Sequence, residues 1–161
     1  MIFLTLFVNN RTCLEKIKPM PIINPKFDLP ALNQISENTL VAYLGIEFTA
    51  VGPDYLTARM PVDQRTVQPF GILHGGASVV LAESLGSMAS ACCIDLEKYA
   101  AVGLEVNANH LRAVSAGYVY GTARPIHLGN RTHVWDIRIE DEKQRPVCIS
   151  RLTMMIIEKQ S

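Results

Sequence analysis

The sequence predicts an α+β fold in which a mainly antiparallel sheet of about six strands wraps around one long buried helix. The first observation is segment 75–93, which carries a single charge, Glu83, among apolar and small residues. A helix that is apolar nearly all round is buried on most sides. The second observation is a series of strand-like runs after this segment, with no helical stretch between them, which favours an antiparallel meander. The third is a pair of strand-like runs before it.

Residues 1–26 are predicted to be an N-terminal extension, peripheral to one domain that spans residues 27–161. The first eight residues are apolar, but a run of that length is too short to cross a bilayer. Basic residues follow this run instead of preceding it, which is unlike a secretory signal.

Before the buried helix, the sequence indicates a short helix and a β-hairpin. Asp28 is a typical N-cap residue, and Pro30 follows it in the first turn of the predicted helix. Strand-like runs at 44–51 and 55–62 are separated by a Gly-Pro-Asp turn at 52–54, which predicts the hairpin.

After the buried helix, strands are predicted at 101–112, 117–128, 133–140 and 146–157. Alternation along the first of them places four residues on one face: Val102, Leu104, Val106 and Ala108. Alternation along the third does the same for Trp135, Ile137 and Ile139. Strands curling around one apolar helix in this way describe the hotdog fold. A long edge strand on such a sheet is a liability unless another subunit pairs with it.

The charge balance argues against several classes of partner. The chain has 15 basic and 15 acidic residues, so its formal net charge is zero. That balance provides neither the basic footprint of a nucleic-acid-binding protein nor an attraction to anionic membranes. Apolar residues make up 48% of the 161 residues and charged residues only 19%, which favours a homo-oligomer. A transmembrane helix at 71–94 is disfavoured because His74, Glu83 and four serines interrupt it.

Other chemistries lack their sequence signals. The cysteines are Cys13, Cys92, Cys93 and Cys148. They show no C-x-x-C spacing and no cluster with histidines, so we interpret them as core residues in a reducing compartment, the cytoplasm. The sequence has neither a G-x-S-x-G nucleophile elbow nor a glycine-rich phosphate loop. We therefore expect no metal and no cofactor.

Glu83 is the main candidate for a catalytic group. A carboxylate inside an apolar helix is costly to bury unless it is paired or its pKa is shifted. One interpretation places Glu83 on a thin exposed stripe or against an arginine. The alternative is a carboxylate that acts as a nucleophile or a general base.

The start of the buried helix is the second candidate. Gly75 and Gly76 leave the first N–H groups uncovered, and a helix N-terminus favours a carbonyl oxygen that develops negative charge. The alternative is a tight turn that needs glycine, with His74 as a cap. Gly75 and Glu83 are eight residues apart, or roughly 12 Å along a helix, too far to act on one carbon. A shared substrate would therefore need the second group from another copy of the chain.

Two polar residues could assist these groups. Ser87 lies one turn after Glu83 on the same helix face. It could hold the carboxylate or a water, or bond back to a helix carbonyl. Gln68 lies in the loop before the helix, where its amide could orient a carbonyl or a water.

The block Gln68 to Ser87 resembles the signature of hotdog acyl-CoA thioesterases. The resemblance is strongest to the 1,4-dihydroxy-2-naphthoyl-CoA and enterobactin-proofreading branch, and more distant to the phenylacetate-pathway enzymes. It continues through 102–112, 125–131 and 150–153, and covers roughly residues 28–157. The N-terminal extension has no match in the family.

The resemblance implies a role for each matching residue. Glu83 matches the catalytic carboxylate, and Ser87 matches the hydroxyl beside the catalytic water. Gln68 and His74 match the residues that hold the thioester, and Gly75 matches the backbone N–H donor. Phe70 matches a substrate-binding position, and Met88 lies beside the acyl pocket, where relatives vary. Positions matching the coenzyme A groove are Gly103, His110, Leu111, Arg112, Ala113, His127, Leu128, Gly129, Asn130, Arg131 and Thr132.

By resemblance we expect an enzyme that hydrolyses an acyl-CoA, with an aromatic acyl group of the dihydroxynaphthoyl or benzoyl type. Menaquinone biosynthesis, siderophore proofreading and aromatic degradation all use this scaffold. The minimal unit would be a homodimer, and the family favours a tetramer built as a dimer of dimers. Two other functions stay open: a hydratase or dehydratase acting on acyl-CoA or acyl carrier protein, and a non-catalytic acyl-CoA binding module.

Overall fold

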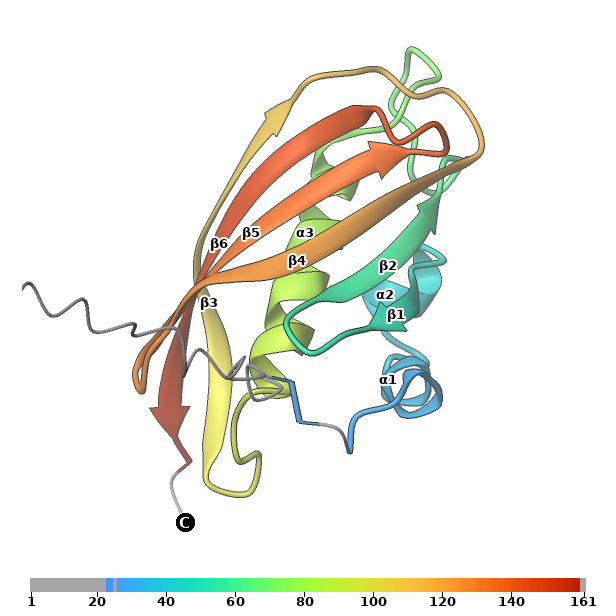
Figure 1. Cartoon of the computed structure of the whole chain (residues 1–161). Helices are drawn as coiled ribbons and strands as arrows, with labels where there is room; N and C mark the ends of the chain where they lie inside the picture. The colour runs from blue at the N-terminus through green and yellow to red at the C-terminus, as the bar shows by residue number, and fades with distance from the viewer. Residues whose placement is uncertain (1–22, 25, 160–161) are drawn as a thin grey trace, which may run out of the picture.

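The computed structural model describes residues 23–24 and 26–159. The helices of this part of the chain are α1 (Leu29–Ile35), α2 (Leu40–Tyr43) and α3 (Gly75–Ala91). The strands are β1 (Glu47–Val51), β2 (Leu56–Pro61), β3 (Tyr99–His110), β4 (Tyr118–Leu128), β5 (Thr132–Asp141) and β6 (Pro146–Glu158). Figure 1 shows the sheet curving around α3, while α1 and α2 lie beside β1. The predicted hotdog fold is confirmed.

The strands pair antiparallel throughout, in the order β1-β2-β4-β5-β6-β3. The predicted meander therefore holds for β4, β5 and β6 but not for β3, which lies outside β6 at the edge of the sheet. The helix α3 crosses the concave face of the sheet, so the chain reaches the far edge before it forms β3. The next strand, β4, then lies in the middle of the sheet, beside β2 (Figure 1). The short helix α2 was not predicted, and the first strand begins at Glu47 rather than at residue 44.

Small residues let α3 lie close to the sheet. A Cβ atom added to Gly121 of β4 would come within 2.6 Å of Leu85 Cδ1, and one added to Gly86 would overlap the side chain of Leu152. Leu81 and Leu85 of α3 are fully buried. Close approach of the two layers removes these leucines from water, which is the main source of stability of the packing.

The inner face of β5 forms the centre of the core. Trp135, Ile137 and Ile139 are fully buried, as their alternation predicted. The Trp135 indole N–H donates to Ser90 Oγ of α3 at 2.7 Å. An indole N–H can only donate, so Ser90 Oγ accepts from Trp135, and His133 Nδ1 lies within hydrogen-bond distance of the same oxygen, at 3.2 Å. This network fits a neutral imidazole, and burial lowers the pKa of His133 below its usual value.

A β-bulge interrupts β3. Its pairing with β6 slips between Gly103 and Glu105, so Leu104 is the extra residue. Val102 is opposite the exposed Met155, whereas Val106 is opposite the buried Leu152. The prediction that Val102 and Val106 share one face is therefore wrong, because the bulge reverses the alternation.

The two edges of the sheet differ. The side-chain amide of Asn33 in α1 closes the free side of β1, since it donates to Phe48 O at 3.0 Å and accepts from Phe48 N at 2.9 Å. The edge at β3 is longer and carries exposed apolar side chains, with Leu104 56% exposed and Val102 37% exposed. Long apolar edges of this kind invite pairing with another strand.

The described part of the chain begins before the predicted domain boundary. Ile23 is buried, and the Asn24 N–H donates to Cys92 O at 3.0 Å. The rest of the predicted extension falls largely outside the described residues. Cys92 and Cys148 are buried, and burial raises the pKa of Cys92 to about 12, as expected for an inert core thiol. Cys13 also lies outside the described residues. Among the helices described, none is long and apolar enough to cross a membrane.

Candidate active site

The loop before α3 is closed at its base by backbone hydrogen bonds. The His74 N–H donates to Thr66 O at 2.8 Å, and Val67 pairs with Leu73 in an isolated bridge. His74 is the N-cap of α3, and its Nδ1 accepts from the Gly76 N–H at 2.8 Å. The acceptor role of Nδ1 leaves Nε2 to carry a hydrogen when the ring is neutral. His74 is thus both a cap and an exposed donor at the helix start.

The Gly75 N–H is free at the same helix start. Among the described residues, no acceptor forms a hydrogen bond with it. His110, at the end of β3, lies against this position, because a Cβ added to Gly75 would come within 2.8 Å of His110 Nε2. A side chain at position 75 would therefore have to displace the ring of His110, and the sequence did not indicate this contact between the helix start and β3.

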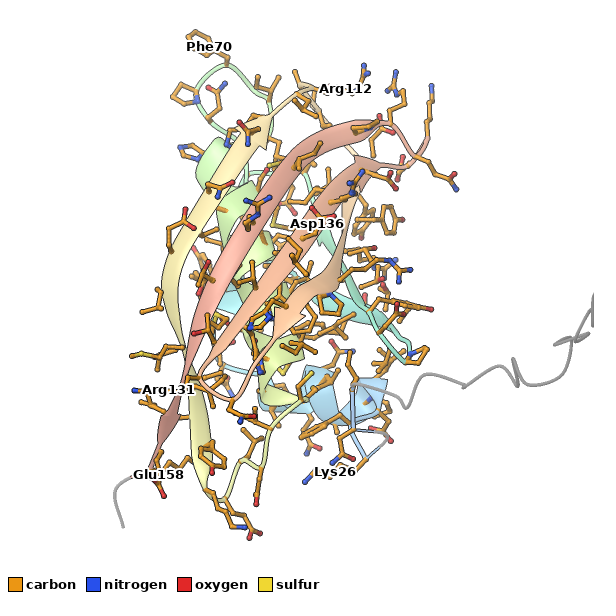
Figure 2. All side chains as sticks on the ribbon, turned by 60° about the vertical axis from the view of Figure 1, so that its left-hand side comes forward. Lys26, Phe70, Arg112, Arg131, Asp136 and Glu158 are labelled. Atoms are coloured by element: carbon orange, nitrogen blue, oxygen red, sulfur yellow. The ribbon has the colours of Figure 1, made fainter. Side chains whose placement is uncertain are left out.

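Gln68 and Phe70 lie at the tip of the loop. Gln68 Oε1 accepts from the Phe70 N–H at 2.8 Å, which leaves the Gln68 amide N–H groups available as donors. The Phe70 side chain is 89% exposed. Figure 2 shows Phe70 and Arg112 at the same end of the molecule.

Glu83 lies in the middle of α3 and is half-buried. Its Oε1 accepts from Ser87 Oγ at 3.3 Å, and Ser87 Oγ is also 3.7 Å from Met154 Sδ of β6. Within the described residues, no arginine or lysine nitrogen lies within salt-bridge distance of the carboxylate. The structure therefore does not support the interpretation of Glu83 as one half of an ion pair.

Gly103 and Met154 complete the surroundings of the carboxylate. A Cβ added to Gly103 would come within 2.5 Å of Glu83 Oε1. Sequence reasoning did not find either contact, because both depend on the register between β3 and β6. The only sequence signal for the first contact is a glycine within a strand-like run.

The residues expected to line one coenzyme A groove do not come together in a single subunit. The Leu111 N–H donates to Val147 O at one end of β6. Near the other end of β6, the Ile156 N–H donates to Arg131 O. These positions on β6 are nine residues apart, or roughly 30 Å along an extended strand. Figure 2 shows Arg112 and Arg131 accordingly at opposite ends of the sheet. The stretch 110–113 lies at the α3 N-terminus, and the stretch 127–132 lies at the far end.

The groups that acyl transfer needs lie at two separate places in one subunit, the start of α3 and its middle. The free N–H of Gly75, with donors from His74 and Gln68, can stabilise an oxyanion. The Glu83 carboxylate, held by Ser87, can act as a nucleophile or a base.

Comparison with known proteins leads to one family. A profile of the thioesterase superfamily matches residues 70–148. The chain is 54% identical over 132 residues to the 1,4-dihydroxy-2-naphthoyl-CoA hydrolase of Escherichia coli, covering 82% of this chain and 96% of that protein. It is 52% identical over 129 residues to the proofreading thioesterase EntH of Klebsiella pneumoniae, covering 80% of this chain and 93% of that protein.

Solved structures agree with these relatives. A mutant thioesterase from Pseudomonas aeruginosa matches with a TM-score of 0.84 at 55% identity, covering 86% of this chain and 99% of that chain. A thioesterase from Haemophilus influenzae matches with a TM-score of 0.82 at 49% identity, covering 85% of this chain and 95% of that chain. The chain therefore belongs to the thioesterase superfamily and is a thioester hydrolase with the hotdog fold.

Proposed function

We propose that this protein hydrolyses an aromatic acyl-CoA to the free acid and coenzyme A, in active sites shared between two copies of the chain. The observation that carries the proposal is the half-buried carboxylate of Glu83, bound by Ser87 and without a cationic partner in the described chain. Of the two relatives reported above, the one named for dihydroxynaphthoyl-CoA favours an aromatic acyl group. The same relative favours a role in menaquinone biosynthesis. The proposed compartment of the reaction is the cytoplasm.

The thioester carbonyl would lie at the α3 N-terminus of one subunit. The Gly75 N–H donates to the carbonyl oxygen, and the donors of Gln68 and His74 hold the thioester group. Negative charge that develops on this oxygen is stabilised by the N–H group and by the helix dipole.

Glu83 of the partner subunit would supply the reacting carboxylate. As a nucleophile, it forms a mixed anhydride while the electron pair of the C–S bond leaves with the sulfur, and water then hydrolyses the anhydride. As a general base, it takes a proton from a water that attacks the same carbon. Both routes release the acid and coenzyme A.

The β3 edge is the proposed surface of association. Two copies of β3 paired antiparallel across a twofold axis place the C-terminal end of one strand beside the N-terminal end of the other. The stretch 110–113 of one subunit then approaches the stretch 127–132 of its partner, which assembles the groove that one subunit lacks. The other edge, β1, is closed by Asn33, so it does not compete for this pairing. A dimer of such dimers would give the tetramer.

A subunit-mixing experiment tests the shared site. Glu83→Ala removes the carboxylate, and Gly75→Val blocks the helix start because its side chain would collide with His110. Each variant alone is expected to be inactive. Refolding the two together in equal amounts should restore about a quarter of the wild-type rate, because half of the dimers are mixed and each has one intact site.

The control for mixing is a pair of variants with the same lesion, Glu83→Ala with Glu83→Gln, which should stay inactive after refolding together. No recovery in the first mixture, with dimers present in gel filtration, would show that each site lies within one chain.

The reaction itself is tested by thiol release from a panel of aromatic and aliphatic acyl-CoA thioesters. We expect fastest release from the aromatic members. A hydratase or dehydratase would release no thiol and would instead change the absorbance of an enoyl-CoA substrate. A binding module would retain acyl-CoA in equilibrium dialysis without turnover, and that result would reject the proposed hydrolysis.

A further inference from the structure

Gly103 of β3 has no backbone reason to be glycine. The glycines of the described chain with a positive φ are Gly45, Gly71 and Gly117, so the conformation at Gly103 is one that other residues adopt. Glycine inside a strand weakens it, because the unfolded chain is more flexible and no side chain packs. Its presence here therefore needs another cause.

The cause is the carboxylate of Glu83. A Cβ on Gly103 would lie 2.5 Å from Glu83 Oε1, 3.5 Å from Cδ and 3.8 Å from Oε2. Real Cβ atoms essentially never approach another heavy atom to less than 3.0 Å. An alanine at this position would therefore have to displace the Glu83 side chain.

Gly103 also belongs to a closed ring of contacts. Glu83 accepts from Ser87, Ser87 contacts Met154, and Met154 is the cross-strand partner of Gly103 in the β3–β6 ladder. The bulge at Leu104 begins directly after Gly103. The pairing of β3 with β6 is therefore regular from Tyr99 to Gly103, and its register shifts by one residue after Gly103. The carboxylate is thus confined between the hydroxyl of its own helix and the backbone of the edge strand.

We infer that Gly103 is a positioning residue for Glu83, which holds one carboxylate oxygen against Ser87 and leaves the other oxygen to act on the thioester. This inference rests on the proposed function, because it takes Glu83 as the reacting group. The oxygen that accepts from Ser87, Oε1, is the one nearer to Gly103, and Oε2 lies farther from the added Cβ, at 3.8 Å. The absence of one methyl group therefore sets the orientation of the attacking atom.

The kinetic test is Gly103→Ala, assayed by thiol release on the best acyl-CoA of the panel. Displacement of a reacting group by about 1 Å can lower the rate on the order of a hundredfold. We expect kcat to fall by about ten- to a hundredfold, with KM changed less than about threefold, since a group that acts in the transition state is misplaced. The control is Arg138→Ala on β5, outside the proposed association surface, whose exposed side chain pairs only with Asp136 in the described chain, with kcat within about twofold of wild type.

A thermal comparison separates positioning from a general effect on the strand. Gly103→Ala should lower the Tm in the Glu83 protein and lower it much less in the Glu83→Ala protein, where the space of the carboxylate is vacant. An equal loss of Tm in both backgrounds would overturn the inference, because the methyl group would then collide with something other than Glu83.

The kinetic outcomes distinguish the inference from the proposed function. Wild-type kcat in Gly103→Ala, together with loss of activity in Glu83→Ala, overturns the inference and leaves the hydrolase intact. Absence of thiol release by the wild type on every substrate rejects the proposed function. The thermal comparison then decides alone whether Gly103 holds the carboxylate in place.

Discussion

Replacing Glu83 with glutamine is expected to lower kcat by about a hundred- to ten-thousandfold, the typical contribution of a catalytic acid–base group. Glutamine has nearly the same shape and keeps a carbonyl oxygen that can accept from Ser87, so the helix and its packing against β3 should persist. The amide is neither a nucleophile nor a base at neutral pH, so the chemical step should fail while acyl-CoA still binds. Thiol release measures the rate, and equilibrium dialysis measures the binding.

The control is the same substitution at Glu37, an exposed residue in the turn after α1, which should leave kcat unchanged. Full activity of Glu83→Gln, at an unchanged Tm, would show that the carboxylate is not the reacting group. The catalytic group would then have to be sought among the polar residues around Gly75, and the mixing experiment would show no complementation.

Replacing Trp135 with alanine should have the largest effect on stability. The side chain is fully buried, and loss of a large aromatic side chain from a core lowers the free energy of unfolding by about 3–5 kcal/mol. Trp135→Phe should lower it by about 1–3 kcal/mol, because the ring is retained but the hydrogen bond to Ser90 is lost.

Urea denaturation at one fixed protein concentration measures both changes, since association also contributes to the stability of an oligomer. The control is Arg138→Ala on the same strand, whose exposed side chain should contribute within about 0.5 kcal/mol. Equal stability of Trp135→Phe and the wild type would mean that the hydrogen bond between β5 and α3 adds nothing to the packing.

Local patterns in the sequence were sufficient for most of the fold. The single charge in segment 75–93 identified α3 as the buried helix, and the alternation of Trp135, Ile137 and Ile139 identified the inner face of β5. Helical spacing alone placed Ser87 beside Glu83, and the two are hydrogen-bonded in the structure. Each of these predictions depends on residues a few positions apart in one element, where the period of the backbone decides which side chains meet.

The arrangement of β3 could not be predicted in this way. A single extra residue, Leu104, reverses the face on which Val102 and Val106 lie, and its only mark in the sequence is the preceding Gly103, which does not fix the position of the bulge. The position of β3 outside β6 depends on where α3 returns the chain, which is a property of the packed layers. The contacts of His110 with Gly75 and of Gly103 with Glu83 follow from both features, so they were missed.

The sequence by itself thus determined most of the elements and the buried helix with its single carboxylate, and the helix spacing predicted a site shared by two copies of the chain. The tertiary structure decided which strand lies at the open edge, which residues surround the carboxylate, and that stretches 110–113 and 127–132 lie at opposite ends of one subunit. The physical reason is the range of the interactions. Periodicity and capping act within one element and can be read along the chain. Strand order, register and close approach instead depend on contacts between residues far apart in sequence, which only the folded chain brings together.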